Sequence, residues 1–133
     1  MELSEIGEFG LIERIRKAFA PDCFKKDGIR GIGDDCAVIP TGNTDSLIST
    51  DMLLEGTHFI RDRITPYDLG WKSLAVNLSD IAAMGGHPTG TFLSLGLPEN
   101  ISSEYMDEFI RGYRDLSLKW SVPLLGGDTT RST

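Results

Sequence analysis

The spacing of apolar positions predicts three helices. Residues 8–20 carry apolar side chains at helical spacing and stop at a proline. Residues 65–85 begin with a threonine cap followed by proline, and they run into a glycine pair. A third helix is expected from Ser102 or Ser103 to Trp120. Its buried stripe should consist of Met106, Phe109, Ile110, Tyr113 and Leu116.

Short apolar runs predict the strands. They are expected over 36–39, 47–50, 89–97 and 122–125, with a further extended segment over 52–59 that breaks at Gly56. The turn at 41–44 indicates that the first two strands form a hairpin. The resulting order favours an α+β domain, with two long helices on one face of a mixed β-sheet.

Apolar runs lead directly into three aspartates, Asp51, Asp80 and Asp128, and such runs place acids at the ends of buried elements. A fourth acidic turn contains Asp34 and Asp35 after a glycine. If these carboxylates converge, each pair repels by roughly 4 kcal/mol at 4 Å in a medium of dielectric constant near 20. Such a cluster needs a cation, and Mg²⁺ takes oxygen ligands from carboxylates and substrate phosphates. The acids therefore point to phosphate chemistry.

Each acidic segment also has a simpler interpretation. Asp80 and its polar neighbours could form the solvated face of a helix, and a glycine pair before Asp128 is common in turns. Of Asp34 and Asp35, one is expected to face a shared centre, because neighbouring side chains of an extended segment point to opposite sides. Ser49 and Thr50 add hydroxyls beside Asp51, which suits Mg²⁺ and its waters. These alternatives stay open on the pattern alone.

Composition narrows the function classes. The 133 residues carry 20 acids and 13 bases, a net charge of −7, which argues against a nucleic-acid-binding protein. No Walker or EF-hand motif is present, and His58 and His87 with two distant cysteines make a poor zinc site. Cys23 and Cys36 fit a reducing compartment, with Cys36 in the core. With no signal peptide or membrane span in the sequence, we expect a cytoplasmic protein.

Five ordered segments resemble the N-terminal half of the thiamine-monophosphate kinase family. This family belongs to the ATP-binding superfamily of aminoimidazole ribonucleotide synthetase and selenophosphate synthetase. The matching segments are 7–12 (GEFGLI), 31–38 (GIGDDCAV), 49–59 (STDMLLEGTHF), 71–86 (WKSLAVNLSDIAAMGG) and 126–131 (GGDTTR).

The resemblance implies Mg²⁺-dependent transfer of the γ-phosphoryl group of ATP to thiamine monophosphate, which gives thiamine diphosphate. By position, it implies that Gly127 and Asp128 contact the nucleotide and that His58 contacts the thiamine phosphate. It assigns no general base. The implied ligands of the Mg²⁺ ions are Asp35, Ser49, Thr50, Asp51, Asp80 and Asp128.

The resemblance also implies a fold like the N-terminal domain of aminoimidazole ribonucleotide synthetase. In it, the sheets of two chains pair into a dimeric β-barrel, so a homodimer is expected. Residues 1–133 would form the ATP- and Mg²⁺-binding and dimerisation domain. Because the chain stops within a site-like segment, we expect it to lack a C-terminal domain and to be inactive alone.

Two other functions are considered. One is that of a different ATP-dependent member of the superfamily, such as selenophosphate synthetase, although Cys23 lacks the glycine-rich surroundings expected of its reactive residue. The other is a non-catalytic dimerisation module that binds divalent cations. Such a module would bind metal equally well without ATP.

Overall fold

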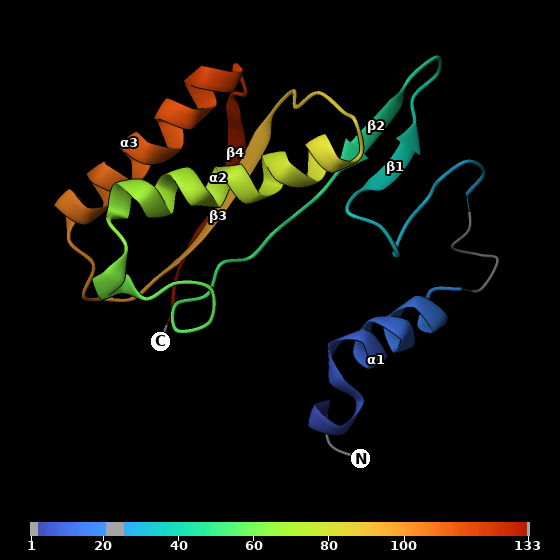
Figure 1. The fold of residues 1–133 in the computed structure, drawn as a ribbon, viewed down its shortest axis with the longest axis horizontal. Coiled ribbons are helices and arrows are strands. Elements are labelled where there is room, and N and C mark those ends of the chain that lie inside the picture. The colour runs from blue at the N-terminus through green and yellow to red at the C-terminus, as the bar shows by residue number, and fades with distance from the viewer. Residues whose placement is uncertain (1–2, 21–25, 133) are drawn as a thin grey trace. The chain divides into compact units, whose positions relative to one another are not determined.

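The computed structural model of the chain describes residues 3–20 and 26–132. The chain divides into two compact units at the boundary between Ile48 and Ser49. Among the described residues, the structure is a mixed α/β arrangement of three α-helices, a short 3₁₀ helix and two small sheets (Figure 1). None of the described helices is long and apolar enough to span a membrane.

The first unit begins with α1 (Leu3–Ala18), which is interrupted at Gly7. Gly7 has φ 64° and ψ −177°, so regular helix starts beyond it, close to the predicted start at residue 8. The apolar side chains at helical spacing are exposed within this unit, among them Ile15 at 43% and Phe19 at 59%. The proline expected to stop the helix lies outside the described residues.

A hairpin completes the first unit. Strands β1 (Ala37–Pro40) and β2 (Asp45–Ile48) pair antiparallel with Val38 opposite Leu47, and the Thr41 backbone N–H donates to the Thr44 carbonyl oxygen at 2.8 Å. The predicted hairpin is therefore confirmed. Cys36 is buried, as expected of a core residue. Cys23 lies outside the described residues.

Two long helices dominate the second unit, α2 (Pro66–Ala83) and α3 (Ser103–Trp120). The Thr65 hydroxyl accepts the Asp68 N–H at 3.0 Å, and the Ser102 hydroxyl accepts the Tyr105 N–H at 3.1 Å. Each cap satisfies a backbone donor that the first helical turn leaves without a partner. Both helices therefore begin where the sequence predicts. The 3₁₀ helix η2 (Arg61–Arg63) precedes α2.

Two buried glycines allow α2 and α3 to touch through their backbones. A Cβ atom on Gly70 would lie 1.9 Å from the Phe109 carbonyl oxygen. In the same way, a Cβ atom on Gly112 would lie 1.9 Å from the Tyr67 carbonyl oxygen. Any larger residue would push the helices apart, so these glycines set how closely the helices approach.

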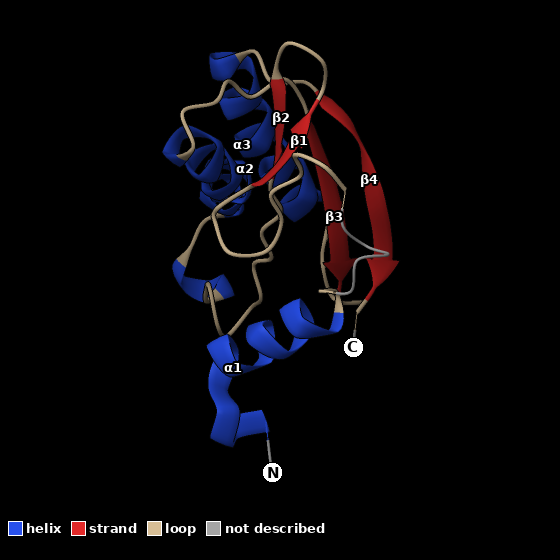
Figure 2. Ribbon diagram, turned by 90° about the vertical axis from the view of Figure 1, so that its right-hand side faces the viewer, coloured by secondary structure: helices blue, strands red, loops and turns tan. Residues whose placement is uncertain are grey.

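The helices cover one face of a parallel sheet. Strands β3 (Thr91–Leu97) and β4 (Leu124–Arg131) pair in parallel, joined by α3. Leu93 packs against a core of Leu74, Tyr113 and Leu116, and Figure 2 shows both helices on the same side of β3 and β4. Phe92, next to Leu93 in β3, is 71% exposed. This confirms the expected pair of helices on one sheet face.

Several expectations need correction. The strands form two two-stranded sheets, one antiparallel and one parallel, where a single mixed sheet was expected. The expected break at Gly56 is confirmed, because Gly56 at φ 81° reverses the chain, but residues 55–59 form a turn closed by a bridge between Glu55 and Phe59 where an extended segment was expected. Ile110 of α3 is 53% exposed, whereas Phe109 beside it is buried.

Candidate functional site

Residues 49–51 are bonded to the C-terminal half of α2. The Ser49 hydroxyl donates to Asp80 Oδ2 at 2.7 Å, and the backbone N–H of Asp51 donates to Asn77 Oδ1 at 3.1 Å. Asn77 and Asp80 are three residues apart, so they lie on the same face of the helix. The structure thereby brings together three of the predicted metal ligands, Ser49, Asp51 and Asp80. Thr50 is exposed between the two anchored residues.

The oxygen donors of this cluster suit Mg²⁺. The two carboxylates and one hydroxyl are hard ligands, and Mg²⁺ typically keeps several waters and binds substrate phosphates as well. Within the described part of the chain, no group of three His, Cys, Asp or Glu side chains could hold a metal ion by itself. These residues therefore do not form a closed site with four protein ligands, as structural zinc sites do. The donors present suit an open metal site, in which phosphate oxygens supply the remaining ligands.

His58 lies in a tight turn that fixes its ring. The Leu54 backbone N–H donates to His58 Nδ1 at 3.0 Å, and the His58 N–H donates back to the Leu54 carbonyl oxygen at 2.8 Å. Because Nδ1 is an acceptor, the neutral ring carries its proton on Nε2. His58 is exposed, so the Nε2–H group is available to a phosphate oxygen. Its predicted role as a phosphate ligand is chemically feasible.

Two basic residues that the sequence did not single out hold the same turn. Lys72 Nζ donates to the His58 carbonyl oxygen at 2.8 Å. Arg61 binds Glu55 through two hydrogen bonds of 2.9 and 2.6 Å, and this contact raises the pKa of the Arg61 guanidinium. Arg61 also donates to Asn100 Oδ1 at 3.3 Å. Their position near His58 depends on how the turn folds onto α2, so no sequence pattern could have found them.

Asn77 was also missed as a site residue, although a signal for it existed. It precedes Asp80 by three residues, which is enough to place both on one helix face. The sequence indicated a polar patch there, but the patch could equally have been a solvated surface. The structure resolves this, because Asn77 and Asp80 both bond to residues 49–51.

Gly127 and Asp128 lie inside strand β4, which corrects the expected turn. Asp128 pairs with Ser94 in β3 and is exposed. A Cβ atom on Gly127 would lie 1.8 Å from the Leu93 carbonyl oxygen. Glycine is therefore required here for close pairing of two strands, a use of glycine that resembles a turn signal in the sequence.

Asp34 and Asp35 lie in the first unit, in a bend before β1. The Asp34 carboxylate accepts the Asp35 backbone N–H at 2.9 Å, and both residues are exposed. Asp34 thus holds the backbone of its neighbour. Asp35 stays the predicted ligand of the pair.

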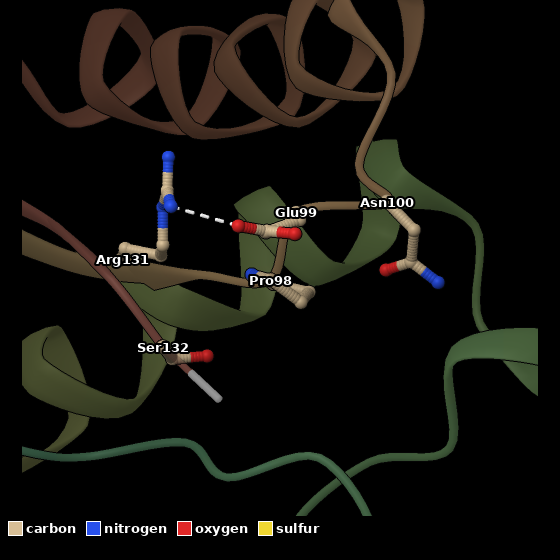
Figure 3. Close-up of a pocket in the computed structure, with 5 residues that line it drawn as sticks. All are labelled: Pro98, Glu99, Asn100, Arg131 and Ser132. Atoms are coloured by element: carbon tan, nitrogen blue, oxygen red, sulfur yellow. Dashed lines mark hydrogen bonds and ion pairs between the residues drawn. The ribbon is translucent and has the colours of Figure 1, made fainter.

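An open hollow of about 360 Å³ lies at the carboxyl ends of β3 and β4 (Figure 3). Arg131 and Glu99 form an ion pair of 2.7 Å on one side of it, and Asn100 lies on the other. Pro98 and Ser132 complete the lining. None of the predicted site residues lines this hollow, but Asn100 connects it to the His58 turn through Arg61.

Relatives of known name match nearly the whole chain. The thiamine-monophosphate kinase of Buchnera aphidicola (subsp. Acyrthosiphon pisum) is 47% identical over 112 residues, which cover 82% of this chain and 34% of that protein. The enzyme of the same name from Aquifex aeolicus is 37% identical over 132 residues, covering 99% of this chain and 40% of that protein. The chain therefore spans between a third and two-fifths of the length of these relatives.

A solved structure agrees with the sequence relatives. AaThiL complexed with AMPPCP and TMP superposes on 100% of this chain and 40% of its own, with a TM-score of 0.89 and 36% sequence identity. The family described as AIR synthase related protein, N-terminal domain, matches residues 33–133. The matched range includes the Ser49–Asp80 cluster, His58 and Asp128. The chain belongs to the AIR synthase related protein family and contains its N-terminal domain.

Proposed function

We propose that this chain is the N-terminal part of a thiamine-monophosphate kinase, which transfers the γ-phosphoryl group of ATP to thiamine monophosphate. The observation that carries the proposal is the bonding of residues 49–51 to α2. It brings Ser49, Asp51 and Asp80 together in a chain whose relatives are named for this activity. The AMPPCP and TMP bound to the similar solved structure support ATP and thiamine monophosphate as substrates.

Mg²⁺ is proposed as the metal, held in part by Ser49, Thr50, Asp51 and Asp80. When bound, it would neutralise phosphate charge and bring the two polyanions together. The acceptor phosphate oxygen is already a nucleophile, so positioning and charge neutralisation carry most of the rate in such a transfer. The protein's own task is to hold oxygen ligands in place, and the site needs no general base.

Three further residues are proposed to bind the metal or the substrates. Asp35 is proposed as a metal ligand, because Asp34 bonds to its backbone and leaves its carboxylate exposed. Asp128 is proposed to bind both metal and nucleotide, with Gly127 beside it. His58 is proposed to donate its Nε2–H to the phosphate of thiamine monophosphate, since its Nδ1 already accepts a bond from Leu54.

We propose that residues 1–133 form the dimerising domain and that the strands of two chains join in a barrel. Phe92 and Leu125, on β3 and β4, are 71% and 61% exposed. Large exposed apolar side chains on a sheet are typical of interfaces, and the two-stranded sheets have unpaired edges. A C-terminal domain would supply the remaining ligands of the nucleotide, since the relatives are more than twice as long. We also propose a cytoplasmic location, with Cys36 as a buried core residue.

The identity of the phosphorylated product tests this function. Full-length protein is incubated with Mg²⁺, γ-labelled ATP and either thiamine monophosphate or selenide, and the labelled products are separated. We expect label in thiamine diphosphate only. Label in selenophosphate would instead support the selenophosphate synthetase alternative. Binding of Mn²⁺ with equal affinity with and without AMPPCP, and no labelled product, would support a non-catalytic cation-binding module.

A further inference from the structure

The segment from Ser49 to His58 runs along α2 in the opposite direction and is bonded to it at three points. Asp80 accepts the Ser49 hydroxyl at 2.7 Å, and Asn77 accepts the Asp51 N–H at 3.1 Å. Lys72 then donates to the His58 carbonyl oxygen at 2.8 Å. As the residue number rises along the segment, the number of its partner on the helix falls. We call these three contacts the α2 clamp.

The clamp fixes a separation that the segment alone would leave open. Fully extended, the nine residue steps from Ser49 to His58 could span about 30 Å. The helix rises only about 12 Å over the eight residue steps from Lys72 to Asp80. Because a helix is stiff, it sets the distance between the proposed metal ligands at one end and the proposed phosphate ligand at the other. The turn at residues 54–59 takes up the remaining length.

The amide group of Asn77 is held in one orientation by its two bonds. Its Nδ2 donates to the Ser73 carbonyl oxygen at 3.1 Å, one turn earlier in α2. Its Oδ1 is thereby directed at the Asp51 N–H. Rotating the amide by half a turn would place donor against donor and acceptor against acceptor. The residue therefore acts as an oriented acceptor for the backbone that carries Asp51.

We infer that Asn77 and Lys72 are positioning residues, which place the metal-binding and acceptor-binding ends of the Ser49–His58 segment separately. Asn77 acts on the metal end through the Asp51 backbone, and Lys72 acts on the acceptor end through the His58 backbone. This inference rests on the proposed function. Removing a group that orients a metal ligand typically lowers the affinity for the metal by about 10- to 100-fold.

The test compares Asn77→Ala and Lys72→Met in the full-length protein, and each variant has its own readout. For Asn77→Ala, we expect the Kd for Mn²⁺ to rise about tenfold. This Kd is measured with AMPPCP present, by electron paramagnetic resonance of the free Mn²⁺. Its KM for thiamine monophosphate should change by less than about twofold. For Lys72→Met, we expect the KM for thiamine monophosphate to rise about tenfold while the Kd for Mn²⁺ stays within about twofold.

Two further variants serve as controls. Lys72→Arg keeps a donor for the His58 carbonyl oxygen and should restore most of the lost affinity for the acceptor. Ser79→Ala changes an exposed position of α2 and should alter neither constant. If both constants move together in both variants, or if neither moves, the inference is wrong, because the two ends are then not placed separately.

A failure of the proposed function is distinguishable from a failure of this inference. If the wild-type protein does not phosphorylate thiamine monophosphate, the Mn²⁺ measurement still tests Asn77. The ¹⁵N chemical shifts of the His58 ring then test Lys72. We expect the tautomer with its proton on Nε2 in the wild type. In Lys72→Met, we expect a mixture of the Nδ1–H and Nε2–H tautomers. Unchanged ring shifts in Lys72→Met would contradict its positioning role.

Discussion

The Ser49 hydroxyl donates a hydrogen bond of 2.7 Å to the Asp80 carboxylate, although the two residues are 31 positions apart in the sequence. Both residues belong to the second unit, and the bond joins its first residue to the last turn of α2. It orients the Asp80 carboxylate and holds the Ser49 hydroxyl oxygen beside it. The local structure thus concentrates hard oxygen ligands before any metal is bound.

His58 should contribute to acceptor binding and not to ATP binding. We expect His58→Ala to raise the KM for thiamine monophosphate by about 10- to 100-fold, since a hydrogen bond to a charged group contributes about 1.5–3 kcal/mol. The KM for ATP should change little. His87→Ala is the matched control, because His87 is the other histidine and is exposed in a loop. Equal KM values for thiamine monophosphate in the two variants would rule out the proposed contact.

Gly112 should be essential to the packing of α2 on α3. In Gly112→Ala, the new methyl group would meet the Tyr67 carbonyl oxygen, and overpacking of this kind typically costs about 1–3 kcal/mol. This loss should outweigh the gain of up to about 1 kcal/mol that alanine brings to a helix. Urea denaturation measures the free energy of unfolding.

Gly96→Ala provides the comparison for Gly112→Ala. A Cβ atom on Gly96 would lie 3.6 Å from the Ser132 Cβ, an ordinary contact, so this variant should be as stable as the wild type or slightly more stable. If the two variants unfold at the same urea concentration, the close approach of the helix backbones is not what makes glycine necessary at position 112.

Alkaline pH should destabilise the second unit. Burial raises the pKa of the Tyr113 phenol above its usual value of 10.0, and the hydrogen bond to Asp115 raises the pKa of Tyr67. Because both pKa values are higher in the folded state, the stabilisation is complete below about pH 10 and is lost as the pH rises further. We expect the free energy of unfolding to decrease above about pH 10, and less steeply in Tyr113→Phe.

Phenolate absorbance provides a second measurement of the same effect. In the folded protein, titration of Tyr113 should appear above the range in which the urea-unfolded protein titrates. If the component lost in Tyr113→Phe titrates in the same range as the urea-unfolded protein, and stability at high pH falls as in the wild type, Tyr113 keeps an ordinary pKa.

Features that depend on local chemistry could be predicted from the sequence. The starts of α2 and α3 follow from the Thr65 and Ser102 caps, because each cap bonds to a backbone group only three residues away. The hairpin likewise follows from its short turn. Asp80 could be placed on a polar helix face, although its partner Ser49 could not be identified.

Features that depend on distant contacts could not be predicted. A glycine required for a turn and one required for close strand pairing look the same in a sequence, so Gly127 suggested a turn where β4 continues. The exposed position of Ile110 depends on how α3 rotates over the sheet. The tautomer of His58 depends on a backbone bond from Leu54, and only the fold reveals that bond.

The most direct test of the central claim is turnover of thiamine monophosphate by Asp51→Asn and Asp80→Asn in the full-length protein at saturating Mg²⁺ and ATP. Each change keeps the size of the side chain and removes the negative charge that a metal needs. Asp107→Asn, at an exposed position of α3, is the control, and circular dichroism checks the fold. We predict no measurable thiamine diphosphate from the first two variants and normal production from the control. Near-normal turnover by both folded variants would contradict the assignment of Asp51 and Asp80 as metal ligands.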